Sequence, residues 1–141
     1  MSTSIEIKLR TAAAATSSLT ALLGTNPFRW YGPQAAQGAA QPLVEVFVVD
    51  APPQYSLQAL LETCRYRIQF TIWDTDLESA RTVERAIIQF LTTFNAYNAG
   101  DSSPIQRNRV VNRRSGKSEP QTGSITYWRT LDAMIWNNEN L

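Results

Sequence analysis

Hydrophobic and polar residues alternate most regularly between Cys64 and Trp73. Apolar and aromatic side chains occupy every second position, and mostly polar ones lie between them, which is the pattern of a strand with one packed face. Cys64 falls on the apolar side, where a free thiol behaves as a small buried hydrophobe. The pattern predicts a strand over residues 64–73. Its more polar side carries Arg65, Arg67, Gln69, Thr71 and Trp73.

A helical pattern follows this strand within a few residues. Apolar residues from Leu77 onward recur with the 3.6-residue period of an amphipathic helix, which predicts a helix over residues 76–94. Thr75 and Glu78 have the spacing of a capping box, in which each side chain bonds a backbone N–H of the first turn. These two residues are therefore expected to start the helix.

The carboxylates around this helix start are the first candidates for chemistry. Asp74, Asp76 and Glu78 lie together, but a helix N-terminus favours negative charge, and the glycine-centred pattern of a calcium loop is missing. We interpret the three as a structural helix start rather than a metal or catalytic site. The polar side of the helix is expected to be solvated and carries Arg81, Glu84, Arg85 and Gln89.

The N-terminal half predicts a further helix and two further strands. An approximate helical stripe and an alanine run predict a helix over residues 4–23, ended by Gly24. A short strand is expected at residues 28–31. Residues 43–50 are apolar on both faces, so we expect a strand that is covered on both sides, either within the subunit or by a neighbouring subunit.

The C-terminal part predicts two strands joined by a basic segment. Residues 105–111 alternate weakly between apolar and polar positions, and residues 124–137 alternate clearly. Residues 112–122 have no apolar anchor and are rich in charged and turn-forming residues. We expect a long basic hairpin in which this segment connects the two strands.

These elements follow the order helix, strand, strand, strand, helix, strand, strand. The order predicts an α+β fold with an antiparallel or mixed sheet of about four to five strands and two main helices packed on one face. At 141 residues the chain is long enough to bury a sizeable core. We expect a single domain over residues 1–141.

The composition offers little for catalysis. The chain has no histidine, and so it lacks the commonest general base and transition-metal ligand near neutral pH. Its single cysteine excludes an internal disulfide. Gly116, Lys117 and Ser118 match the end of a phosphate-binding loop, but Val111 stands where the first glycine of that motif belongs. We expect no enzymatic activity, no metal and no cofactor.

The sequence does not predict a membrane protein. No segment reaches the roughly 18 consecutive apolar residues that span a bilayer, and the first residues lack the pattern of a signal peptide. The net charge of +1 produces no global attraction to nucleic acid or to a membrane surface. We therefore expect a soluble protein that is made in a cytosol.

A local excess of positive charge is the better functional lead. Two acids reduce the net charge of residues 101–120 to +3. A hairpin tip with this charge could touch a phosphate backbone, or the charge could protect a strand edge from aggregation. No aromatic residue is interleaved with the cations, so any contact with nucleic acid is expected to be sequence-blind. The candidates for contact with DNA or with another subunit are Arg107, Arg109, Arg113, Arg114 and Lys117.

Three tryptophans lie opposite the apolar stripes of the predicted strands. Their number indicates a face that is covered, either by the protein's own helices or by another subunit. Together with the arginines of the first strand they are candidates for a subunit interface. This set contains Arg65, Arg67, Trp73, Trp128 and Trp136.

Short motifs spread over nearly the whole chain carry a family resemblance. They lie at residues 21–25, 32–34, 42–44, 55–57, 65–73, 76–94 and 127–136. In this combination the chain resembles the tail-completion or tail-terminator proteins of long-tailed bacteriophages, which are found at the head–tail junction. The basic segment at residues 112–122 matches no motif of that family.

The resemblance implies a small α+β subunit that closes into a ring, usually a hexamer. The ring would cap the finished tail tube and join it to the head connector, with DNA passing through its lumen. The expected partners are further copies of the chain, the tail-tube protein, connector or neck proteins, and DNA. The resemblance brings no catalytic residues, and it places the protein in the tail or neck of a virion that is assembled in the host cytoplasm.

Two alternatives stay open. One is a head-completion or connector protein of the neck, which belongs to the same structural class. The other is a module that binds nucleic acid without sequence preference through the basic hairpin.

Overall fold

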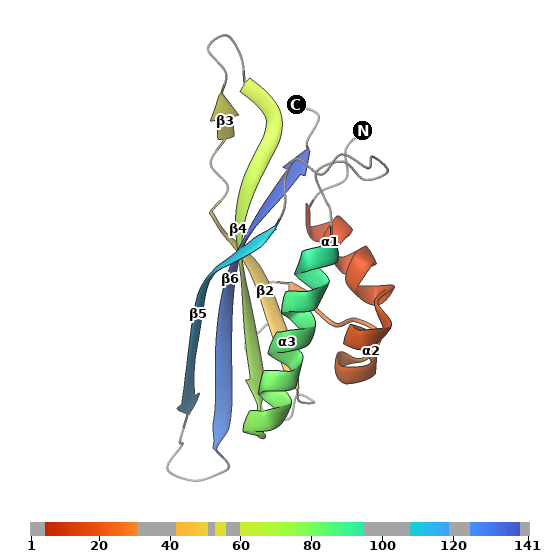
Figure 1. The fold of residues 1–141 in the computed structure, drawn as a ribbon, viewed down its shortest axis with the longest axis vertical. Helices are drawn as coiled ribbons and strands as arrows, with labels where there is room; N and C mark the ends of the chain where they lie inside the picture. Colours follow the sequence, from red (N-terminus) through yellow and green to blue (C-terminus); the bar gives the residue numbers. More distant parts are fainter. Residues whose placement is uncertain are drawn as a thin grey trace.

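The computed structural model describes residues 5–30, 42–50, 53–55, 60–94, 108–118 and 125–138. In this part of the chain the helices are α1 (Ile5–Ala14), α2 (Ser17–Leu23) and α3 (Leu77–Thr93). The strands are β1 (Arg29–Trp30), β2 (Leu43–Asp50), β3 (Pro53–Tyr55), β4 (Leu60–Asp74), β5 (Arg109–Ser118) and β6 (Thr126–Asn138). Figure 1 shows the three helices grouped on one side of the sheet.

The strands form one sheet in the order β1-β2-β4-β6-β5, and β3 pairs with β4 outside this path. β1 runs parallel to β2. The other pairings are antiparallel. The predicted α+β class with an antiparallel or mixed sheet is therefore confirmed, and β3 is a short strand that the pattern did not predict.

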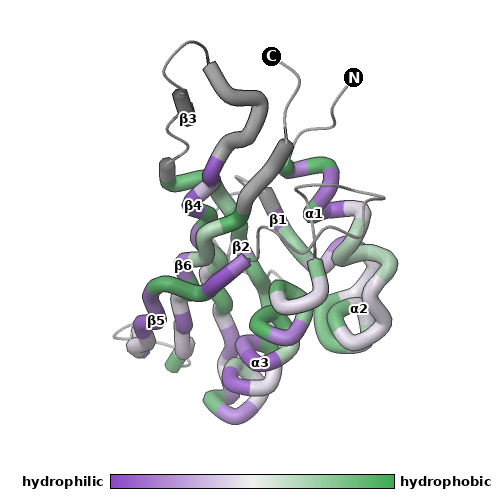
Figure 2. The backbone as a smooth tube through the Cα atoms, turned by 45° about the horizontal axis from the view of Figure 1, so that its top comes forward, coloured by the Kyte–Doolittle hydropathy of each residue, from purple (hydrophilic) through white to green (hydrophobic). Residues whose placement is uncertain are grey.

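The core lies between the helices and one face of the sheet. Ile68, Phe70 and Ile72 alternate along β4 and are fully buried, as the period of two predicted. They belong to the same cluster as Val83 and Ile87 of α3. Hydrophilic and hydrophobic residues alternate along α3 (Figure 2), and most of the residues that this helix buries are apolar. The side chain of Cys64 lies outside the described part.

The predicted helix over residues 4–23 is wrong, because it is two helices with a break at residues 15–16. Thr16 has extended backbone angles, and its hydroxyl donates to the carbonyl of Ala12 at 2.7 Å. A threonine hydroxyl that bonds the backbone in this way competes with the helical ladder. Gly24 ends α2 as predicted, at a φ of 88° and with its N–H bonded to the Thr20 carbonyl.

The predicted capping box of Thr75 and Glu78 is also wrong. The N-cap of α3 is Asp76, whose carboxylate accepts a bond of 3.2 Å from the N–H of Glu78. Asp74 accepts in turn from the N–H of Asp76, also at 3.2 Å. The helix begins one residue later than the box requires, and the carboxylates of Asp74 and Asp76 bond backbone N–H groups at its start.

The basic segment is a strand, not a connection as predicted. β5 covers residues 109–118, so most of the segment at 112–122 pairs with β6 in an antiparallel hairpin. The strand predicted at 105–111 begins only at Arg109, and its first residues lie outside the described part. β5 is the last strand of the described sheet, and its residues are exposed or half-buried. Val110 packs partly against the core, but no residue of β5 is fully buried, so hydrophobic alternation marks this edge strand only weakly.

Candidate interaction surface

The sheet face that points away from the helices carries the residues predicted for a subunit interface. Arg65, Arg67 and Trp73 alternate along β4 with the buried core residues, so they lie on this outer face. Trp73 pairs directly with Trp128 across β4 and β6. The structure therefore brings four of the five predicted residues onto one face. Trp136 pairs with Arg65 in register, but its side chain lies outside the described part.

A row of residues in register, which we call the aromatic row, crosses the outer face from β2 to β5 and has two tryptophans at its centre. Its successive partners on four neighbouring strands are Leu43, Trp73, Trp128 and Gly116. A Cβ atom on Gly116 would lie 2.4 Å from the Cζ2 atom of Trp128. The glycine thus leaves room for the indole ring to lie on the edge strand. This packing explains Gly116 without a phosphate-binding loop.

An ion pair lies further along the same face. Arg67 donates through Nη2 to Oδ2 of Asp132 at 2.7 Å, and Asp132 is only 3% exposed. Three polar groups of this face are buried without a hydrogen-bond partner in the described part of the chain. They are Oδ1 of Asp132, Nε of Arg67 and the indole N–H of Trp73. Buried polar atoms are normally paired. Their presence here distinguishes the outer face from an ordinary solvated surface.

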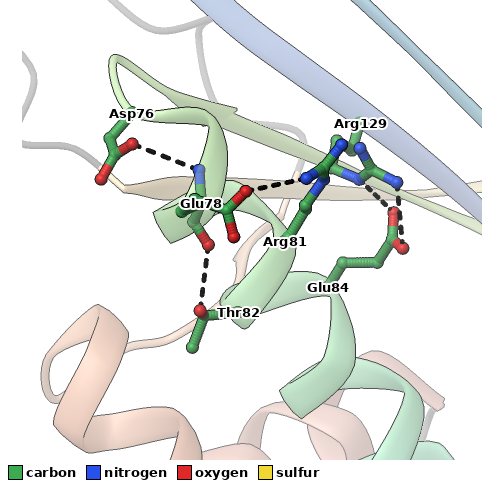
Figure 3. A network of polar contacts seen from close by, with 6 residues as sticks. All are labelled: Asp76, Glu78, Arg81, Thr82, Glu84 and Arg129. Carbon is green, nitrogen blue, oxygen red and sulfur yellow. Dashed lines mark hydrogen bonds and ion pairs between the residues drawn. The ribbon is translucent and has the colours of Figure 1, made fainter.

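Glu84 is a residue that the sequence pattern misplaced. It was expected on the solvated side of the helix, but it is 2% exposed and points from α3 toward the sheet (Figure 3). Arg129 of β6 donates through Nε to Oε2 at 2.5 Å and through Nη2 to Oε1 at 3.3 Å. Arg113 of β5 also donates to Oε1. The cluster of Glu84, Arg113 and Arg129 thereby joins α3 to both strands of the hairpin.

The electrostatics of Glu84 follow from this arrangement. Burial acts to raise the pKa of Glu84, but hydrogen bonds and charge attraction from Arg129 and Arg113 outweigh it and hold the pKa below its ordinary value. Glu84 is therefore ionised at neutral pH. Arg129 was not among the predicted site residues. It shares a strand face with the core residues Leu131 and Ala133, and a cation in an apolar stripe was the signal that could have found it.

The predicted DNA-contacting cations fall on different faces of the edge strand. Arg109 and Arg114 pair in register with Met134 and Thr130 of the outer face, and both are exposed. Arg113 pairs with Leu131 on the helix side. A bulge at Val111 lies between Arg109 and Arg113, so these two arginines fall on opposite faces although they are four residues apart. Lys117 falls on the helix side by register, opposite Tyr127, and Arg107 lies outside the described residues. The structure therefore divides these cations between two faces.

Within the described residues, no group of three or more carboxylate, cysteine or histidine side chains is arranged to hold a metal ion. Among the described helices, none is both long and apolar enough to cross a membrane.

Comparison with known proteins gives a fold likeness but no family. No protein-family model matches the chain, and no curated protein sequence matches it. The fold is similar to that of a chain in the solved structure entitled "Virion of native gene transfer agent (GTA) particle". The TM-score is 0.57 at 13% sequence identity, and the alignment covers 92% of this chain and 92% of that chain. The two chains therefore share a fold over almost their whole length.

Proposed function

We propose that this chain is a structural virion protein of a phage-like particle, and within that class a tail terminator. Copies of the chain form a ring, expected to be a hexamer, which closes the tail tube and joins it to the head connector while DNA passes through the lumen. The observation that carries the proposal is the fold likeness to a chain of a gene transfer agent virion, which covers 92% of both chains.

The outer face supports the proposal as the subunit contact. Trp73 and Trp128 are partners in register on this face, and the ion pair further along it leaves Nε of Arg67 and Oδ1 of Asp132 buried without a hydrogen-bond partner in the described part of the chain. Aromatic residues and arginine are enriched in protein interfaces. In a closed ring each subunit presents two different surfaces, one to each neighbour. We assign the outer face to one of these two contacts.

A pair of matched variants tests this assignment. Thr71 lies in the middle of the outer face, and Thr92 is exposed on α3. Thr71→Arg places a bulky cation in the contact and should abolish oligomers, whereas Thr92→Arg should leave them intact. Mass photometry measures both proteins in the presence of tail tubes. Equal behaviour of the two variants would remove the outer face from the interface.

The location of the ring separates a terminator from its neighbours in the neck. A terminator should bind the end of an isolated tail tube, while a head-completion or connector protein should bind the capsid portal. Electron microscopy of the protein mixed with each structure distinguishes these outcomes.

Binding of nucleic acid without sequence preference is the second candidate. It is favoured by one observation: β5 carries four cations and no carboxylate between residues 109 and 118. Charge reversal of Arg109 and Arg114, which are exposed on the outer face, should abolish a salt-sensitive association with DNA. DNA binding that survives this double change, or that is absent at low salt, would exclude the candidate.

A further inference from the structure

The two arginines that contact Glu84 have different environments. Arg129 is 16% exposed and bonds both carboxylate oxygens. Arg113 contacts one oxygen through a single nitrogen, and its side chain is 56% exposed. Since Arg129 alone balances the charge of Glu84, Arg113 adds an unbalanced positive charge to the cluster.

We propose that Glu84 is a positioning residue that holds Arg113 ready to bind a phosphate group of a nucleic-acid backbone. A guanidinium has five N–H donors in a fixed plane, and only one nitrogen of Arg113 is engaged by Glu84. Arginine in a fixed orientation matches the geometry of phosphate oxygens. Holding the side chain in advance lowers the entropy that is lost when the ligand binds.

The surroundings of Arg113 favour a phosphate backbone over an acidic protein. β5 lies at the edge of the described sheet, so the cations on its two faces border the same edge. The strand carries no carboxylate, and its residues are exposed or half-buried. Protein interfaces have an apolar centre, whereas contacts to DNA are polar and strongly cationic. The composition of this edge corresponds to the second type.

This inference rests on the proposed function only in that DNA passes close to the assembled subunit. The two can fail separately, because oligomers are measured by mass and the phosphate contact is measured by DNA binding. An intact ring without DNA affinity would overturn the inference alone.

The test measures the affinity of Glu84→Gln for a short labelled DNA duplex at low salt. The deciding observation is whether this affinity rises or falls relative to the wild type. If Glu84 contributed only its negative charge, its removal would strengthen binding to a polyanion. A positioning role predicts the opposite, because Arg113 loses the group that holds it. We expect Arg113→Gln to weaken binding about tenfold, with a salt slope smaller by about one. Glu84→Gln should weaken binding at least about threefold, in the same direction.

Two further variants serve as controls. Arg85→Gln removes one positive charge, as Arg113→Gln does, but at an exposed position of α3. It should weaken binding less than Arg113→Gln. Arg113→Lys keeps the charge but loses the planar donor group, so it should also weaken binding. It decides the question if Glu84→Gln does not fold. The proposal would be overturned if folded Glu84→Gln bound DNA as tightly as the wild type or more tightly, or if Arg113→Lys kept full affinity. It would also be overturned if Arg85→Gln and Arg113→Gln had equal effects, or if the wild type bound poly-glutamate as tightly as DNA.

Discussion

At the scale of single residues, Glu84 adds an ionic contact between α3 and the hairpin, whose strand β6 is also paired with β4. Its carboxylate is buried, and it is bonded by arginines from two neighbouring strands. A buried charge is tolerated only with such partners, because the cost of removing it from water is large. The alternation of the helix placed Glu84 on a polar side, and the sequence contains nothing local that reveals its partners. The partners lie 29 and 45 residues away, and only the paired strands bring them to α3.

Removal of Arg129 should destabilise the protein more than removal of Arg113. Arg129→Met leaves the buried carboxylate without its better partner and should lower the free energy of unfolding by about 3 kcal/mol. Arg113→Met removes an arginine that is more than half exposed, and it should cost about 1 kcal/mol or less. Urea denaturation at pH 7 measures both changes. Equal losses would show that the two arginines hold Glu84 equally.

Glu84 should also make stability depend on pH. Its pKa in the folded protein lies below the ordinary value of 4.5 for a glutamate side chain. Its contribution is therefore present above the unfolded pKa and is lost as the pH falls through the folded pKa, because the unfolded chain binds the proton more readily. Denaturation at pH 7 and at successively lower pH should show a steeper loss for the wild type than for Glu84→Gln. Parallel curves would contradict the lowered pKa.

At the scale of elements, the hydrophobic pattern predicted those strands and helices that have at least one packed side. β2 covers residues 43–50 as predicted. The alternation in β4 and the stripe of α3 were equally informative. The pattern failed where other interactions decide: the hydroxyl of Thr16 interrupts the N-terminal helix, and β5 is a strand because it pairs with β6. Neither interaction has a periodic signature in the sequence.

The aromatic row gives a prediction about the hairpin. Gly116→Ala should lower the free energy of unfolding by about 1–3 kcal/mol, because the new methyl group would overlap the ring of Trp128. In a Trp128→Leu background the same substitution should cost much less. A double-mutant cycle by chemical denaturation measures this coupling. Additive effects would show that the ring does not occupy the space above residue 116.

At the scale of the whole molecule, the helices cover one face of the sheet, and the opposite face carries the candidate interaction surface (Figure 1). The sequence already indicated an assembly surface through its tryptophans, and four of the five residues in that set lie together on the outer face. It could not indicate the ion pair of Arg67 with Asp132, which depends on the register of β4 and β6. The fold likeness to a virion chain covers 92% of this chain.

Electron microscopy of the purified protein, alone and mixed with isolated tail tubes, tests whether the chain is a tail terminator. The proposed role predicts closed rings at one end of the tubes, with subunits in contact through the outer face. A protein that remains monomeric in both conditions, with tube ends bare, would contradict the role of this chain as a tail terminator.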